Sequence, residues 1–132
     1  MNAKRPVYVR GRLLGIAVLV ATQLFIGIIH LCSGAAMLSG VFPSSSLVYS
    51  LYTLAYGFLT LVFTWMLWLG MRVGWIGTVA IAFFIIVADS LAMLGVFNGL
   101  DIPWNAGFGE IPYSLLILAY LLQSHVRAKY KV

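Results

Sequence analysis

The sequence contains very few charged residues, and only three of them are acidic. Charged residues make up 8% of the 132 residues, whereas about a quarter of the residues in soluble domains are charged. Hydrophobic residues make up 63% of the chain. This composition excludes an ordinary soluble domain and favours a protein of the lipid bilayer.

The sequence also lacks the patterns on which most catalytic and metal sites depend. Cys32 is the one cysteine, and on a helix it points away from His30, so the two side chains cannot share an ion. There is no phosphate-binding glycine loop, catalytic triad or pair of carboxylates at a reactive centre. We therefore expect no catalytic activity of its own, no metal site and no cofactor, with contact to lipid or quinone left open.

Long apolar runs fill most of the chain. The stretch 13–40 carries no charge, and as a helix it is about 42 Å long, more than the ~30 Å of a bilayer's hydrocarbon core. Further apolar runs lie at about 47–69, without charge, and at about 75–97, where Asp89 is the one charged residue. A fourth helix is expected over 111–129 with Pro112 in its first turn. The sequence predicts one all-α domain over 1–132, with four transmembrane helices in an antiparallel bundle.

The basic residues are confined to three places that share one side of such a bundle. They lie in the N-terminal arm, at Arg72 between the second and third runs, and in the C-terminal tail at Arg127, Lys129 and Lys131. The positive-inside bias then puts both termini in the cytoplasm. We expect a multi-pass protein of a prokaryotic cytoplasmic membrane that contacts anionic lipids, and we expect no nucleic-acid binding because there is no folded basic face.

Three polar residues are expected at membrane depth, and they are the candidate site. From the cytoplasmic ends of their helices, Gln23 lies about 15 Å, His30 about 26 Å and Asp89 about 21 Å into the membrane, so His30 and Asp89 can meet. A carboxylate at that depth needs a partner or a role. Asp89 is interpreted first as a structural carboxyl bonded to His30, Gln23 or Ser90, and alternatively as a proton or cation site or a contact with another subunit.

Small residues beside these polar ones predict which helices pack most tightly. Gly27 and Gly34 share a stripe with Gln23 and His30 on the first helix, and Asp89 shares a stripe with Gly74 on the third. Small residues let helix backbones approach closely in membranes. The first and third helices are therefore the predicted closest pair.

Two further features suggest surfaces at the membrane boundary. Tyr49, Tyr52 and Tyr56 form a stripe that we interpret as interface anchoring and helix packing, with an aromatic lining for quinone or lipid as the alternative. The stretch 98–111 is expected to form an ordered external loop. Its predicted partner-docking residues combine an aromatic anchor with hydrogen-bonding groups: Asp101, Trp104, Asn105 and Glu110.

The chain resembles small four-helix integral membrane proteins of archaea and bacteria whose function is not characterised. The resemblance rests on Ile28-Ile29-His30-Leu31-Cys32-Ser33-Gly34, on the connection from Gly70 to Trp75, and on the end of the last helix, Tyr120 to Arg127. It implies the fold and carries over no function or residue role.

Two hypotheses for the function follow from the sequence. The first is a non-catalytic accessory or structural subunit of a larger membrane complex, such as a membrane oxidoreductase, because the small size and the lack of catalytic motifs favour a hetero-oligomer. The alternative is a small transporter or channel that works as a homo-oligomer, with Asp89 and His30 at a proton or ion site.

Overall fold

The computed structural model describes residues 7–9, 12–42, 46–100 and 102–132. Five α-helices account for most of them: α1 (Leu14–Leu38), α2 (Leu47–Trp68), α3 (Arg72–Met93), α4 (Gly107–Leu121) and α5 (Ser124–Tyr130). A 3-10 turn, η1 (Trp104–Ala106), precedes α4. Two short strands, β1 (Tyr8–Val9) and β2 (Arg12–Leu13), pair antiparallel before α1.

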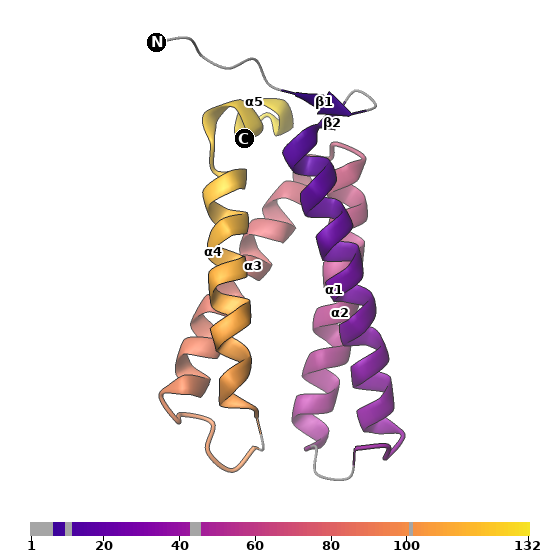
Figure 1. Cartoon of the computed structure of the whole chain (residues 1–132), viewed down its shortest axis with the longest axis vertical. Helices are drawn as coiled ribbons and strands as arrows, with labels where there is room; N and C mark the ends of the chain where they lie inside the picture. The colour runs from indigo at the N-terminus through magenta and orange to yellow at the C-terminus, as the bar shows by residue number, and fades with distance from the viewer. Residues whose placement is uncertain (1–6, 10–11, 43–45, 101) are drawn as a thin grey trace.

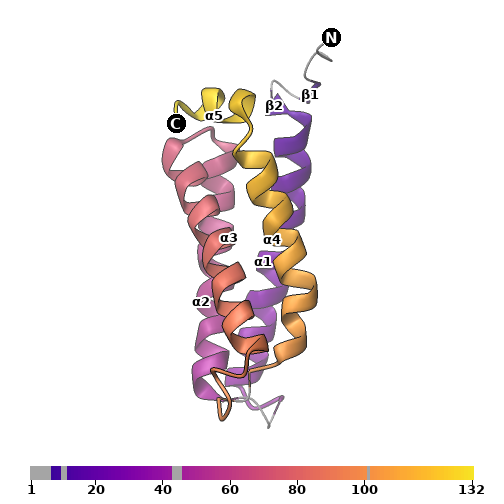
Figure 2. The same ribbon diagram turned by 90° about the vertical axis from the view of Figure 1, so that its left-hand side faces the viewer.

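The four long helices run alternately in opposite directions and lie side by side (Figures 1 and 2). α1, α2 and α3 are each long and apolar enough to cross a membrane, and a fourth crossing is present if α4 and α5 form one bent span. The all-α prediction is confirmed, and three helices have the length and apolar composition predicted for membrane spans. The third helix begins and ends about one turn earlier than predicted, at Arg72 and Met93.

The two ends of the molecule differ in character. We call the end that holds Arg72 and α5 the basic end, because the described basic side chains Arg127, Lys129 and Lys131 lie there too (Figure 1). We call the opposite end the loop end, because the chain after α1 and the chain after α3 both turn there. Gly70, with φ 80°, closes α2 at the basic end: the amide of Met71 bonds to the carbonyl of Met66 at 3.0 Å, the geometry that ends many helices at a glycine.

The predicted continuous fourth helix over 111–129 is wrong in its start and in its continuity. α4 begins earlier, at Gly107, so Pro112 lies inside the helix, and the helix breaks after Leu121. α5 then turns by 74° and covers the basic end. The break is held by two bonds, because Trp75 Nε1 donates to the carbonyl of Leu121 at 3.0 Å and the Tyr130 hydroxyl donates to the carbonyl of Leu67 at 2.8 Å.

The prediction that the first and third helices form the closest pair is also wrong. α1 packs most extensively against α2, and α3 packs against α2 and α4. The small residues of α1 do mark a contact face, but they meet α2: a Cβ atom on Gly57 would lie 2.7 Å from the amide nitrogen of Leu31 and 2.9 Å from the carbonyl oxygen of Gly27. α2 supplies a matching stripe of small and hydroxyl residues that includes Ser50, Thr53, Thr60 and Thr64.

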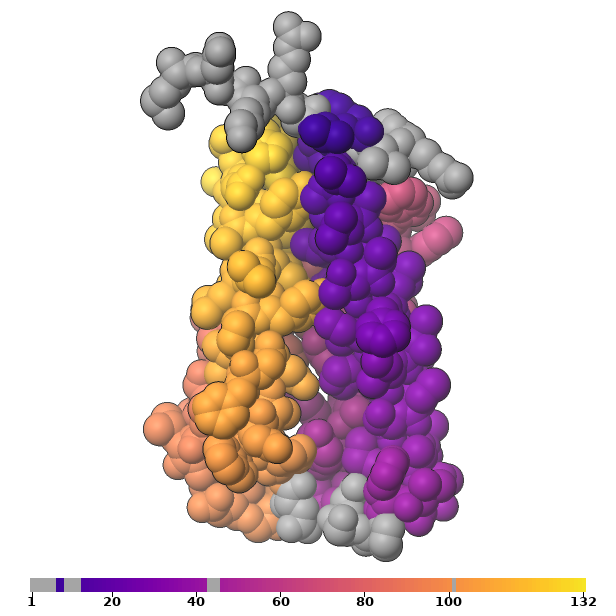
Figure 3. Space-filling view, viewed as in Figure 1, coloured from indigo at the N-terminus to yellow at the C-terminus, as the bar shows by residue number. Residues whose placement is uncertain are grey.

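The hydrophobic core lies toward the basic end. Ile16 of α1, Leu67 of α2, Leu121 of α4 and Val126 of α5 are fully buried in one cluster. Toward the loop end α1 and α4 separate, and a recess opens between them in the lower half of Figure 3. The molecule is therefore closed at its basic end and hollow at its loop end.

Candidate functional site

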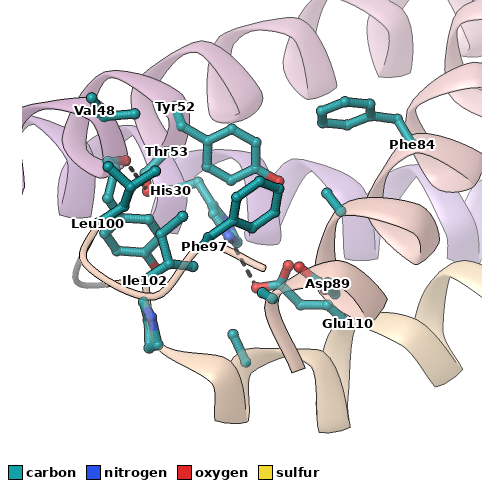
Figure 4. A pocket seen from close by; sticks show the side chains of 15 residues that line it. His30, Val48, Tyr52, Thr53, Phe84, Asp89, Phe97, Leu100, Ile102 and Glu110 are labelled. Carbon is teal, nitrogen blue, oxygen red and sulfur yellow. Dashed lines mark hydrogen bonds and ion pairs between the residues drawn. The ribbon is translucent and has the colours of Figure 1, made fainter. Parts of the chain in front are cut away.

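A cavity of about 210 Å³ occupies the loop end between α1, α2, α3 and α4. Its roof is the chain between α3 and η1, including Leu100 and Ile102. The Ser46 hydroxyl donates to the carbonyl of Leu100 at 2.5 Å, which ties this roof to the start of α2. Three ionisable side chains line the cavity: His30, Asp89 and Glu110 (Figure 4).

His30 enters the cavity from α1 with one ring nitrogen already occupied. Its Nδ1 lies 2.8 Å from the carbonyl oxygen of Ile26. A carbonyl only accepts hydrogen bonds, so Nδ1 carries a proton, and Nε2 is the nitrogen left to exchange protons with the cavity. The edge of the ring is fixed against Tyr56, whose ring centroid lies 4.6 Å away.

Glu110 meets His30 from the opposite side of the cavity. Glu110 Oε1 lies 3.6 Å from His30 Nε2, with the two side chains 31% and 21% exposed. Glu110, which the sequence placed in an external loop, belongs to the first turn of α4 and points inward. Its role in docking a partner stays a prediction. A carboxylate in the first turn also suits the positive end of the helix dipole.

Asp89 comes from α3 and lies next to Glu110 (Figure 4). Its Oδ2 atom is buried, and among the described residues it has no hydrogen-bond partner. The partners expected for a purely structural carboxyl are used elsewhere: the Ser90 hydroxyl donates to the carbonyl of Ile86 at 2.6 Å, and Gln23 Oε1 accepts from the Thr64 hydroxyl at 2.9 Å. Asp89 thus has one buried oxygen without a partner, on a carboxyl group that lies beside Glu110 in the cavity wall.

The structure brings His30 and Asp89 into one cavity and places Gln23 outside it. Gln23 is buried between α1 and α2, nearer the basic end, where its bond to Thr64 joins the two helices. Of the predicted docking residues, Trp104 and Asn105 are exposed at the surface, and Trp104 contacts Phe108 edge to face. Asp101 lies outside the described residues.

Aromatic rings form much of the cavity wall. Tyr49 and Tyr52 line it from α2 and Phe84 lines it from α3. The rings of Tyr52 and Phe84 lie 6.3 Å apart, and the Tyr52 hydroxyl is buried without a hydrogen-bond partner among the described residues. The tyrosine stripe therefore faces the cavity over part of its length, which matches the aromatic-lining alternative more closely than interface anchoring.

Sequence reasoning missed Glu110 and Tyr52 as members of the site. The signal for Tyr52 was present in the stripe spacing, because Tyr49, Tyr52 and Tyr56 share one face of a helix. Glu110 was assigned to a loop because Gly107 and Gly109, which lie in the first turn of α4, are residues typical of loops.

Within the described part of the chain, no three His, Cys, Asp or Glu side chains are placed to hold a metal ion. Cys32 is exposed. Comparisons with protein-family models, with curated proteins and with solved structures find no match to this chain.

The cavity combines two carboxyl groups, an imidazole and largely apolar walls. Two neighbouring carboxyl groups in a site of low polarity repel each other when both are ionised, and a proton or a cation between them relieves the repulsion. Among the described residues every Lys and Arg lies at the basic end, so no fixed cation besides the His30 imidazole compensates the two carboxyls. The arrangement suits a ligand that is cationic, apolar in its body, and able to donate hydrogen bonds.

Proposed function

We propose that the protein is a four-span membrane protein, with its basic end in the cytoplasm, that binds a small protonated amine in the cavity at its loop end. The observation that carries the proposal is the pair of unpartnered buried oxygens, Asp89 Oδ2 and the Tyr52 hydroxyl, that belong to residues of one cavity. Buried polar atoms in proteins nearly always have partners. A ligand that donates hydrogen bonds would supply them.

Three features of the cavity favour an amine over other ligands. An ammonium group donates up to three hydrogen bonds and neutralises a carboxylate, which a quinone carbonyl cannot do. Aromatic faces such as those of Tyr52 and Phe84 attract a cation. The cavity walls are otherwise apolar, which suits a hydrocarbon body.

The closed basic end favours binding over conduction. Ile16, Leu67 and Leu121 are fully buried there, and α5 covers that end. A continuous water path across a single chain would have to cross this packed cluster. The site is therefore proposed as a binding site reached from the loop end or from the lipid. Of the hypotheses from sequence, the ion-site alternative is the one closest to this proposal, and the accessory-subunit hypothesis stays a prediction.

The proposal is tested by comparing n-octylamine with n-octanol. Octylamine is protonated at neutral pH, as a lysine side chain is, and octanol is neutral with the same alkyl chain. Binding of each to the protein in phosphatidylcholine nanodiscs is measured by isothermal titration calorimetry. We expect saturable binding of octylamine at one site and at least about tenfold weaker binding of octanol.

Asp89→Asn is the variant that identifies the site. It keeps the side-chain shape and removes the charge, and a hydrogen bond to a charged group contributes about 1.5 to 3 kcal/mol. We expect roughly 10-fold to 100-fold weaker octylamine binding with octanol binding unchanged. Ser90→Ala is the matched control, because the Ser90 hydroxyl bonds only within α3. Equal octylamine affinity in wild type and Asp89→Asn would contradict the proposal.

A further inference from the structure

A second hollow runs along the outside of the molecule between α2 and α3. It is an open groove of about 440 Å³ lined by side chains that include Tyr52, Leu59 and Phe63 of α2 and Ala80 and Phe84 of α3. Tyr52 and Phe84 line both this groove and the cavity described above. The two hollows are thus neighbours, with these two rings at their boundary.

The groove extends from the cavity toward the middle of the molecule. On α2 it runs from Tyr52 to Phe63, about 16 Å along the helix, and it ends where the Phe63 ring lies against Gly77, since a Cβ atom on Gly77 would overlap that ring. Half of a ~30 Å hydrocarbon core is about 15 Å. The groove therefore has about the length of one leaflet, and it runs along the middle of α2 with one end at the cavity.

We infer that the ligand is a single-chain alkylamine, with its ammonium group in the cavity and its alkyl chain in the groove between α2 and α3. This inference rests on the proposed function. It is supported by the adjacency of the two hollows, which share Tyr52 and Phe84 in their walls, and by the apolar lining of the groove. The resulting orientation places the ammonium group toward the loop end and the alkyl chain along the middle of α2.

Chain length distinguishes an occupied groove from ordinary lipid-facing surface. In a bilayer the alkyl chain leaves lipid to enter the groove, so the gain comes from close packing and not from removal from water. Longer amines also partition more strongly into lipid, which raises their apparent affinity for any membrane protein. Each amine partitions equally into the lipid of the same nanodiscs whichever variant they hold. The ratio of the affinities of two variants for one amine therefore reports only the contribution of the groove.

The test variant is Ala80→Phe, which adds a large side chain to the exposed floor of the groove. Binding of butylamine, octylamine and dodecylamine is measured for wild type and variant in phosphatidylcholine nanodiscs. We expect butylamine affinity to change by less than about twofold and dodecylamine affinity to fall roughly tenfold, with octylamine between them. Ala55→Phe fills the groove from α2 and should act in the same way, and Ala21→Phe on the exposed face of α1 is the control with no effect.

The outcomes separate this inference from the proposed function. One outcome is saturable amine binding that is lost in Asp89→Asn, together with a wild-type to Ala80→Phe affinity ratio that is the same for all three amines. This outcome would contradict the proposed role of the groove and would still support the amine site. Absence of saturable binding for all three amines would overturn both. A dodecylamine-specific loss in Ala80→Phe and Ala55→Phe, absent in Ala21→Phe, supports the inference.

Discussion

Glu110 Oε1 lies 3.6 Å from Nε2 of His30, and this ion pair bridges α1 and α4 where the two helices have separated around the cavity. Because Nδ1 of His30 is held by the carbonyl of Ile26, the imidazole presents a defined nitrogen to the carboxylate. The pair therefore joins the two helices beside the cavity.

Glu110→Gln should weaken the ligand site more than the fold. Both side chains of the pair remain partly exposed, and an ion pair of this kind contributes at most about 1 kcal/mol to stability. A glutamine can also keep a hydrogen bond here, because its amide oxygen accepts from a protonated Nε2 and its amide nitrogen donates to an unprotonated one. We expect a small decrease in melting temperature and a several-fold loss of octylamine affinity. A large loss of thermal stability with unchanged amine affinity would show that the pair is structural.

Thr64→Val tests the role assigned to Gln23. The valine keeps the shape of threonine and removes the hydroxyl that donates to Gln23 Oε1 at 2.9 Å. We expect a loss of about 1 kcal/mol in the free energy of unfolding, with a coupling of roughly 0.6 kcal/mol to Gln23→Leu in a double-mutant cycle. Amine binding should not change. Thr22→Val is the control, because the Thr22 hydroxyl bonds to Val18 of its own helix. If Thr22→Val lowers the free energy of unfolding as much as Thr64→Val does, the bond to Gln23 has no specific role.

The positions of the helices could be predicted from the sequence, whereas their pairing could not. Uncharged runs bounded by glycines placed α1 and α2 within two residues of their observed ends. Gly27 and Gly34 identified a contact face correctly, but a stripe of small residues does not say which neighbour fills it, and α2 carries an equally suitable face at Gly57. The break before α5 could not be predicted, because Leu122 and Gln123 both have high helix propensity.

The candidate site could be predicted in part. The depths of His30 and Asp89 along their helices placed both toward the same end, and they line one cavity. Glu110 could not be assigned to the site from the sequence. Its inward direction depends on the helical phase of α4, which is set by the start of that helix at Gly107. That Asp89 Oδ2 has no partner could not be predicted from the sequence. It depends on Ser90 bonding to Ile86 and on Gln23 bonding to Thr64, which are tertiary and rotamer details.

Cysteine labelling tests the proposed orientation. In a Cys32→Ser background, single cysteines at Phe42 and Asn105 at the loop end should react in intact cells with a membrane-impermeant maleimide. Cysteines at Met71 and Lys131 at the basic end should react only after the membrane is permeabilised. This follows from the retention of basic residues on the cytoplasmic side. Labelling of Met71→Cys from outside would contradict the orientation.

Purification from native membranes in a mild detergent tests the accessory-subunit prediction. A stable hetero-complex is expected, and Trp104→Ala should lower recovery of the partner without preventing membrane insertion, because Trp104 and Phe108 form an aromatic pair that is 60% and 63% exposed. Phe58→Ala, which removes an exposed ring from α2, serves as the control. Elution of the wild type without other chains would refute the subunit prediction.

The most direct test of the amine site is the distance between a bound amine nitrogen and the Asp89 carboxyl carbon. The chain contains two aspartates, Asp89 and Asp101, so ¹³C-carboxyl aspartate labelling in an Asp101→Asn background marks Asp89 alone. Solid-state NMR dipolar recoupling to ¹⁵N-octylamine in lipid bilayers should then give a separation of about 4 Å, and excess unlabelled amine should abolish the coupling. Saturably bound octylamine without any coupling to Asp89 would contradict the proposed site.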